Sequence, residues 1–140
     1  MNNSYGEARP KVYNDLAGIS EVREIINASP KRVVDQLITN LSTSQPCVRT
    51  AIVYGPMIYG EGRGPVNQRS IQIPDLANAT LKHGQGFYVG KGLSTWSHVH
   101  ISDITRLIVS LVSEASSSIN QPLWNATGIY FPEAGRMVGY

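Results

Sequence analysis

The stretch CVRTAIVYGPMIYGEGRGP, residues 47–65, decides the fold class. Its first part, Cys47–Tyr54, ends in a nearly continuous apolar run, which is typical of a strand covered on both faces in a parallel sheet. We expect the strand to stop at the Gly55-Pro56 pair. The glycine-rich segment Tyr59–Pro65 follows as a loop, so the sequence predicts a buried strand that leads into a loop with unusual backbone freedom.

Amphipathic helices lie on both sides of this strand in the sequence. We expect one over Ser29–Leu41, capped by its first residue and with Pro30 at its first helical position. A second is predicted over Pro74–His83, closed by the glycine that follows, and a third begins at the capping residue Ser102. On all three, apolar residues recur at helical spacing, which predicts one buried face for each. The predicted buried faces consist of Val33, Val34, Leu37, Ile38 and Leu41, then Leu76, Ala77, Thr80 and Leu81, then Ile104, Leu107, Ile108, Leu111, Val112 and Ala115.

The remaining predicted elements are short. They are a helix over Glu21–Ile26, extended stretches over Gly86–Val89 and Trp96–Ile101, and strands centred on Trp124–Thr127 and Gly128–Phe131. Helices that alternate with strands indicate an α/β architecture. Since only one strand has the character of a buried parallel strand, we expect part of a sheet.

Composition excludes several classes of protein. The 140 residues are 41% hydrophobic and 16% charged, which suits a globular domain and argues against a disordered chain. The formal net charge of +2 is spread along the chain, so we expect no nucleic-acid partner. No signal peptide or bilayer-long apolar stretch is visible, so we expect a cytoplasmic protein without membrane contact. A single cysteine, Cys47, excludes an internal disulfide.

The glycine-rich loop is the first candidate site. Gly60, Gly62 and Gly64 would let the backbone approach an anion closely, and Arg63 and Arg69 would neutralise it. The loop matches neither the dinucleotide fingerprint G-x-G-x-x-G nor the Gly-Lys-Ser/Thr of a P-loop. Two interpretations therefore stand, a tight loop at a strand exit and a loop that lines a ligand.

Polar side chains give two weaker candidates. His98 and His100 lie two residues apart in an extended stretch, so both rings project from the same face, and Asp103 follows. Spacing fixes no third ligand, so we predict histidines hydrogen-bonded within the fold and no metal site. Lys31 and Asp35 form an i,i+4 pair, either a solvent-facing pair or a cofactor-binding ammonium held by its carboxylate.

Three segments resemble the second half of the extended short-chain dehydrogenase/reductases, the NAD-dependent epimerase/dehydratase-like proteins. Val53–Gly62 is similar to the family's strand and "P-x-IYG-x-G" turn. Val89–Gly92 with Trp96–Ile104 is similar to its "G-x-G…VHV-x-DL" segment. Gly64–Pro74 is similar to a stretch of fungal members. Together they cover most of the chain between Asn27 and Phe131.

The resemblance implies a fold as well as a family. We expect residues 29–140 to form the C-terminal part of a doubly wound, Rossmann-like fold with small substrate-binding α/β elements, apparently truncated. Residues 1–28 form a poorly matched segment before it. The family's dinucleotide fingerprint belongs to an N-terminal βαβ unit that this sequence does not contain.

The resemblance also implies roles for single residues, with NAD or NADP as the cofactor. Lys31 would be the lysine of the family's catalytic Tyr-x-x-x-Lys, close to the nicotinamide ribose, while Asn27 stands at the tyrosine position. Because an amide has no titratable hydroxyl, Asn27 cannot replace that tyrosine as a proton donor. Pro56, Met57 and Ile58 would line the nicotinamide, and Tyr59, Arg69, Trp96 and His100 would face the substrate.

Two functions stay open. The first is an NAD(P)-dependent oxidoreductase or epimerase/dehydratase-like protein, in an active, truncated or inactive form. Trp96 stands where nucleotide-sugar enzymes of the family have an arginine, which favours a small organic metabolite as substrate. The second is a non-catalytic binding module of the same ancestry, in which an exposed sheet edge pairs with a second copy or another chain.

Overall fold

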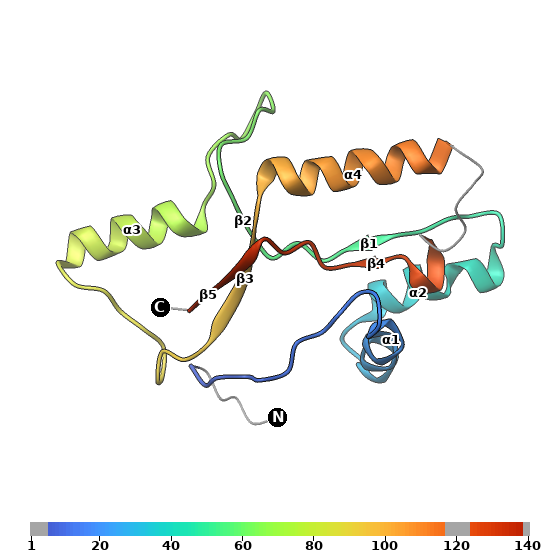
Figure 1. Ribbon diagram of the computed structural model, residues 1–140, viewed down its shortest axis with the longest axis horizontal. Helices are drawn as coiled ribbons and strands as arrows, with labels where there is room; N and C mark the ends of the chain where they lie inside the picture. Colours follow the sequence, from blue (N-terminus) through green and yellow to red (C-terminus); the bar gives the residue numbers. More distant parts are fainter. Residues whose placement is uncertain (1–5, 117–123, 139–140) are drawn as a thin grey trace. The chain divides into compact units, whose positions relative to one another are not determined.

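In the computed structural model, residues 6–116 and 124–138 are described, and they form a mixed α/β fold (Figure 1). The helices are α1 (Ile19–Ala28), α2 (Val33–Ser44), α3 (Gln72–His83) and α4 (Ile101–Ser116), with a 3-10 turn, η2 (Asn125–Thr127). The strands are β1 (Ile52–Val53), β2 (Met57–Tyr59), β3 (Thr95–His100), β4 (Ile129–Tyr130) and β5 (Gly135–Val138). None of the described helices is long and apolar enough to span a bilayer.

The chain divides into two compact units. Unit 1 consists of Met1–Lys11, Gly55–Arg106 and Glu133–Tyr140, and so contains α3 and the strands β2, β3 and β5. Unit 2 consists of Val12–Tyr54 and Leu107–Pro132, and so contains α1, α2, β1, β4 and η2. The helix α4 begins in unit 1 and ends in unit 2.

Unit 2 is built around a pair of parallel strands, β1 and β4, in the register Ile52↔Ile129. The buried residues Val22 and Ile26 of α1 meet Ile129 in one apolar cluster, against which Tyr54 and other half-buried residues pack. The predicted helix near Glu21–Ile26 is thus confirmed as α1, and the last predicted strand as β4. The predicted strand Cys47–Tyr54 is much shorter, because only two of its residues pair with a neighbour.

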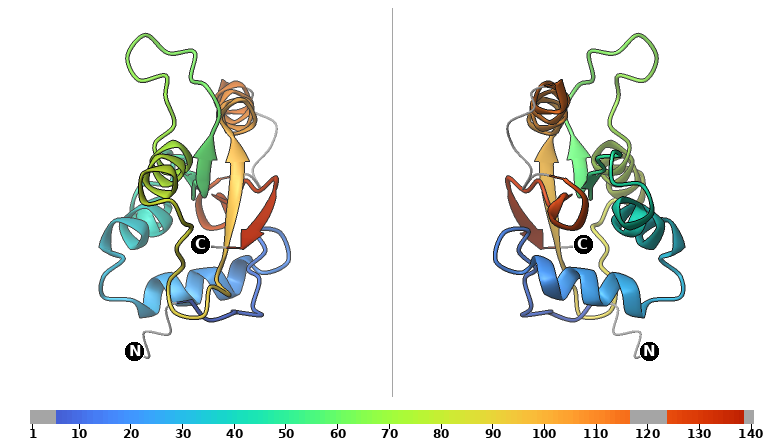
Figure 2. Two further views of the ribbon diagram at one scale, coloured as in Figure 1. Left: turned by 90° about the vertical axis from the view of Figure 1, so that its left-hand side faces the viewer. Right: turned by 90° about the vertical axis from the view of Figure 1, so that its right-hand side faces the viewer.

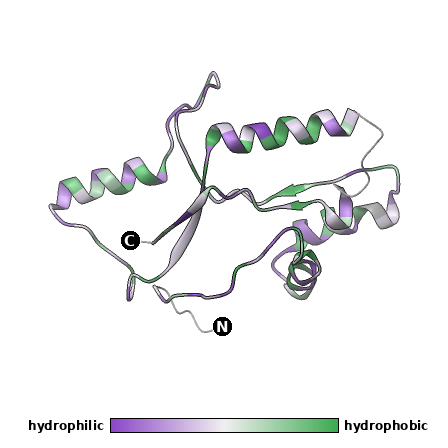
Figure 3. Ribbon diagram, viewed as in Figure 1, coloured by the Kyte–Doolittle hydropathy of each residue, from purple (hydrophilic) through white to green (hydrophobic). Residues whose placement is uncertain are grey.

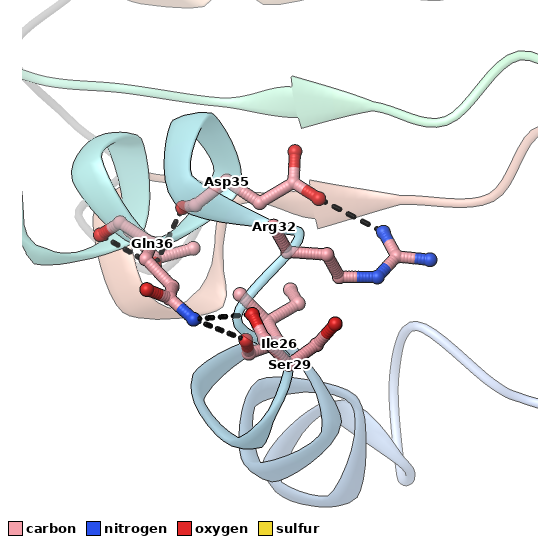
Figure 4. A network of polar contacts seen from close by, with 6 residues as sticks. Ile26, Ser29, Arg32, Asp35 and Gln36 are labelled. Carbon is pink, nitrogen blue, oxygen red and sulfur yellow. Dashed lines mark hydrogen bonds and ion pairs between the residues drawn. The ribbon is translucent and has the colours of Figure 1, made fainter.

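The start of α2 differs from the prediction, and Pro30 explains why. The residue before a proline is pushed away from helical geometry, and Ser29 accordingly has φ −98° and ψ 111° and ends α1. The helix α2 begins only at Val33, after Arg32. Figure 4 shows how Gln36 ties the two helices together, since its Nε2 donates to the carbonyl oxygens of Ile26 at 2.8 Å and Ser29 at 2.9 Å.

The predicted buried face of α2 is wrong for three of its five residues. Val33, Val34 and Leu37 are 64%, 66% and 64% exposed. The packed side of α2 includes Thr39, which is buried, and the other two residues of the predicted face, Ile38 and Leu41, which are half-buried. Helical spacing therefore predicts where the apolar side chains of α2 lie, but not which of them are buried. We call Val33, Val34 and Leu37 the α2 apolar surface.

The other two helices also carry apolar residues on open faces (Figure 3). On α4, Ile104 and Leu111 are buried as predicted, whereas Ile108 and Val112 are exposed. The helix α3 ends as predicted at Gly84, which has a left-handed backbone with φ 72°. No residue of α3 is buried, however, so its predicted inner face is exposed or half-buried in this part of the structure.

Unit 1 holds a three-stranded sheet in the order β2-β3-β5 (Figure 2). β2 pairs with β3 in parallel, in the register Met57↔His98 and Tyr59↔His100, and β5 pairs with β3 in the antiparallel sense. The predicted extended stretch Trp96–Ile101 is confirmed as β3. Two other predicted strands are wrong, because residues 86–89 are irregular and residues 125–127 form the turn η2.

Candidate functional site

The candidate site begins where β2 runs into the glycine-rich loop of unit 1. Gly60 has φ 102°, a backbone conformation that side chains strongly disfavour. A Cβ atom at Gly60 would lie 2.3 Å from Nε2 of His100, on the neighbouring strand β3. Close approach of the two strand ends, rather than anion binding, is therefore what requires glycine at this position.

The loop and the beginning of α4 line an open hollow in unit 1, with a volume of about 820 Å³. We call it the loop hollow. The loop contributes Glu61, Arg63 and Gln68 to its lining, and the other side contributes His100 and Arg106. Both strand-exit geometry and a ligand-sized space are present, so the two interpretations of the glycine-rich loop are compatible.

Two smaller hollows of about 400 Å³ each adjoin the same strands. The strand hollow is lined by Pro56, Ile58, Arg69 and other residues. The tryptophan hollow is lined by Pro56, Met57 and Trp96, with Gly55, Gln72 and Ser97. No charged residue lines the tryptophan hollow.

The arginines of these hollows differ in whether a carboxylate already neutralises them. Arg69 forms an ion pair with Asp75 at 2.5 Å, and Arg106 forms one with Asp103 on the next turn of α4. Arg63 has no ion-pair partner among residues 6–116 and 124–138. Its guanidinium is the cation of the loop hollow that remains available to a ligand.

The ring of His100 is held by the first turn of α4. The backbone N–H of Ser102 donates to Nδ1 of His100 at 3.2 Å, and the Ser102 hydroxyl lies 2.7 Å from the same nitrogen. The imidazole therefore acts as a helix cap, a role usually taken by a short oxygen-bearing side chain. Sequence reasoning assigned that role to Ser102, which instead lies inside the helix.

His98 lies deeper in the sheet than His100. Tyr59 contacts both rings edge-on, at centroid distances of 5.5 Å to His98 and 5.2 Å to His100. Nδ1 of His98 is buried and has no hydrogen-bond partner in the part of the chain that the structure describes. No group of three potential metal ligands occurs among those residues either.

Most residues predicted to form the site lie around these hollows. Pro56, Met57, Ile58, Arg69, Trp96 and His100 line at least one of them, and Tyr59 packs against His100. The roles assigned to them by resemblance stay predictions. Gln68, Thr105 and Arg106 also line the loop hollow and were missed. Gln68 lies in the motif-like stretch Gly64–Pro74 but was given no role there, and Thr105 and Arg106 belong to no motif and reach the hollow only through the fold.

The predicted catalytic lysine lies elsewhere, in unit 2. Lys31 is exposed in the turn between α1 and α2, while Asn27 belongs to the last turn of α1. The break at Ser29 and Pro30 means that the two positions do not share a helix, as the Tyr-x-x-x-Lys motif would require. The carboxylate of Asp35 pairs with Arg32 at 2.8 Å, in place of the expected pair with Lys31.

Unit 2 contains a polar cluster that sequence reasoning did not find, at the end of β1. Tyr54 stacks on Phe131 with ring centroids 5.4 Å apart, and the Arg32 guanidinium lies 5.8 Å from the Tyr54 ring centre. The phenol oxygen of Tyr54 is buried and makes no hydrogen bond to any described residue. Burial and the nearby Asp35 carboxylate raise the pKa of Tyr54 to about 12, although Arg32 opposes the shift.

Comparison with known proteins identifies one informative relative. The chain is 33% identical, over 142 aligned positions and 96% of its own length, to a curated protein named Oxidase ucsJ from Acremonium sp.. The match spans 41% of the length of that relative. No protein-family model matches the chain, and no solved structure matches it.

Proposed function

We propose that this chain is part of an NAD(P)-dependent oxidoreductase that acts on a small organic metabolite. The observation that carries the proposal is the 33% identity, over 96% of the chain, to a relative named as an oxidase. The match spans only 41% of the length of that relative, so the relative's activity is a proposal for this chain. The proposed fold is a partial Rossmann-like one, of the extended short-chain dehydrogenase/reductase type.

The position of the family-like motifs supports this proposal. Val53–Gly62 contributes β2 and the beginning of the glycine-rich loop, and Trp96–Ile104 contributes β3 and the start of α4. These are the elements that line the three hollows of unit 1. An epimerase or dehydratase of the same type would use the same hollows, since its reaction also begins with removal of a hydride.

NAD or NADP fits the site at its nicotinamide end. Pro56, Met57 and Trp96 give the tryptophan hollow an apolar lining, which suits a planar ring. When bound, the cofactor would supply or accept the hydride, and Pro56 and Met57 would position its ring. This chain contains no G-x-G-x-x-G between a strand and a helix to hold the pyrophosphate.

Titration of the purified chain with NADH and NADPH, followed by cofactor fluorescence, tests the proposal. We expect saturable binding at micromolar concentrations. A Met57→Lys variant places a charge in the apolar lining and should weaken binding about tenfold. The matched control is Leu81→Lys on α3, where the leucine is 83% exposed and lines none of the three hollows. A flat titration at millimolar cofactor would contradict cofactor binding by this chain.

The α2 apolar surface favours a second candidate function, a non-catalytic partner module. Three large aliphatic side chains, each at least 64% exposed on consecutive turns, form the kind of patch that protein partners cover. In addition, β1 and β4 pair only with each other among the described residues, which leaves sheet edges unpaired. We propose a second copy of the chain as the partner.

Light scattering tests this alternative. We expect a dimer mass for the wild-type chain and a monomer mass for the variant Val34→Glu/Leu37→Glu, because two carboxylates cannot be buried in an apolar interface without large cost. The control variant Leu81→Glu should remain dimeric. A monomeric wild-type chain at all concentrations would argue against the partner module.

A further inference from the structure

The imidazole of His100 has a fixed tautomer in its neutral form. The backbone N–H of Ser102 can only donate, and it donates to Nδ1 at 3.2 Å. A ring nitrogen that accepts a hydrogen bond carries no proton, so the proton of the neutral ring lies on Nε2. The Ser102 hydroxyl, 2.7 Å from Nδ1, donates to the same lone pair and favours the same tautomer.

No described residue accepts a hydrogen bond from the resulting Nε2–H donor. Among the described residues, the hydrogen bonds of the His100 ring are those to Ser102, and both are made by Nδ1. His100 lines the loop hollow, and its ring is half-buried. Nε2 lies next to the Gly60 backbone, since a Cβ at that position would lie 2.3 Å from this nitrogen. The ring is therefore positioned by Ser102 and Gly60, and no described residue accepts a hydrogen bond from Nε2.

Charged groups of both signs line the loop hollow. Arg63 and Arg106 line it as cations, and Glu61 lines it as an anion. Asp103 already pairs with Arg106. Arg63 forms no ion pair with any described residue, so its guanidinium and the His100 donor are left for an incoming group. A guanidinium and an N–H donor together match the two oxygens of a carboxylate.

We propose that His100 and Arg63 bind the carboxylate of a small organic acid, which is then the substrate class of the reaction proposed above. The role of this acid as a substrate rests on the proposed function, whereas its binding to the hollow does not. His100 acts through Nε2–H as a hydrogen-bond donor to one oxygen, and Arg63 supplies the charge. Gln68 and Thr105 also line the hollow and suit hydroxyl or carbonyl substituents of the acid, while Ile101 adds an apolar side chain to the lining.

Two substitutions separate the two nitrogens of His100. His100→Asn places an oxygen near the position of Nδ1, so it can still accept the Ser102 N–H but has no donor at the position of Nε2. His100→Gln reaches toward the position of Nε2 and gives up the cap. We expect His100→Asn to weaken acid binding about tenfold with the unfolding midpoint retained. We expect His100→Gln to keep binding within about threefold and to lower the midpoint.

Binding is measured on the full chain by NMR, with pyruvate, lactate and inorganic phosphate as the probes. The nitrogen shifts of His100 report the tautomer, and the Arg63 side-chain signals report the contact. Arg63→Gln should weaken pyruvate binding about tenfold, while the controls His83→Asn and Arg9→Gln, at exposed positions elsewhere, should not. Selective, saturable binding of pyruvate or lactate with these variant effects supports the proposal.

Three outcomes would overturn it. An Nδ1–H tautomer of His100 would mean that Nε2 cannot donate to the acid. Absence of pyruvate and lactate binding would mean that the hollow does not bind organic acids. Phosphate binding as tight as pyruvate binding would make the hollow a general anion site. None of these depends on the NADH titration, so organic-acid binding and cofactor binding can fail separately.

Discussion

Gly60 occupies a position that a side chain cannot share with His100. Its φ of 102° disfavours any other residue, and an added Cβ would lie 2.3 Å from Nε2 of the imidazole. We predict that Gly60→Ala lowers the free energy of unfolding by about 1–3 kcal/mol, as strained backbone positions typically do. It should also displace the His100 ring signals in NMR spectra.

Urea unfolding measures the first effect, and Gly64→Ala is the matched control in the same loop. A Cβ at Gly64 meets nothing within 4 Å, so the control should change stability by no more than about 0.5 kcal/mol. Equal losses for both variants would show that the loop, and not the approach to His100, requires glycine.

The Tyr54 phenol should make stability depend on pH in the alkaline range. Burial beside Asp35 raises its pKa from 10.0 to about 12 in the folded chain. Above pH 10 the unfolded chain therefore loses the Tyr54 proton while the folded chain keeps it, so the free energy of unfolding falls as pH rises from 10 to 12. Below pH 10 this contribution is fully present.

Urea unfolding at pH 9 and pH 11 measures this dependence. We expect Tyr54→Phe to reduce the loss of stability between the two values, because phenylalanine does not titrate. Tyr88→Phe is the control, since Tyr88 is 69% exposed. If Tyr54→Phe and Tyr88→Phe lose the same stability between pH 9 and pH 11 as the wild-type chain, the phenol is not the cause.

At the scale of elements, the turn η2 connects to the segment before β1 through one asparagine. Asn125 has φ 62°, and its Oδ1 accepts hydrogen bonds from the backbone N–H and the hydroxyl of Thr50, at 3.0 Å and 3.2 Å. Asparagine tolerates a left-handed backbone better than most residues do. Asparagine at position 125 therefore both tolerates the left-handed backbone and makes the hydrogen bonds to Thr50.

Two variants of Asn125 separate these contributions by urea unfolding. Asn125→Gly keeps the backbone conformation but loses the hydrogen bonds, and we expect a loss of about 1 kcal/mol. Asn125→Ala adds backbone strain, and we expect about 1 kcal/mol more. Asn78→Ala on the exposed part of α3 should be close to neutral. A less stable Gly variant than Ala variant would contradict the argument.

The helices were predictable from the sequence, and the strands were much less so. A stripe at helical spacing persists over many residues, so α3 and α4 were located to within two residues at each end. β1, β2 and β4 contain two or three residues each, too few for a period to be recognised. Pro30 was assigned to a helix start, although its effect on the preceding residue makes it the break between two helices.

The candidate site was also only partly predictable from the sequence. The residues in motifs, such as Tyr59 and His100, could be assigned to one site because the family resemblance covers both, although only β3 of the two strands was predicted. Arg106 and Thr105 could not, since only the approach of α4 to the loop brings them to the hollow. The use of His100 as a cap was hidden because histidine is an uncommon residue there, although the His-x-Ser spacing could have indicated it.

Each unit contains buried apolar residues, which leads to a prediction for the whole chain. Val22, Ile26 and Ile129 form the core of unit 2, whereas the buried residues Val99 and Ile104 belong to unit 1. Truncation of a fully buried isoleucine removes contacts and leaves a cavity. We therefore predict that Ile26→Ala destabilises unit 2 by about 2–5 kcal/mol.

Two tryptophans allow each unit to be followed by its own fluorescence, because Trp124 lies in unit 2 and Trp96 in unit 1. We expect Ile26→Ala to shift the urea midpoint reported by Trp124 in a Trp96→Phe background. The midpoint reported by Trp96 in a Trp124→Phe background should shift less, since Ile26 belongs to the buried cluster of unit 2 and Trp96 to unit 1. Leu81→Ala, at an exposed site, should leave both midpoints unchanged. Equal shifts at both tryptophans would mean that α4, which passes from one unit into the other, makes the chain unfold as one cooperative body.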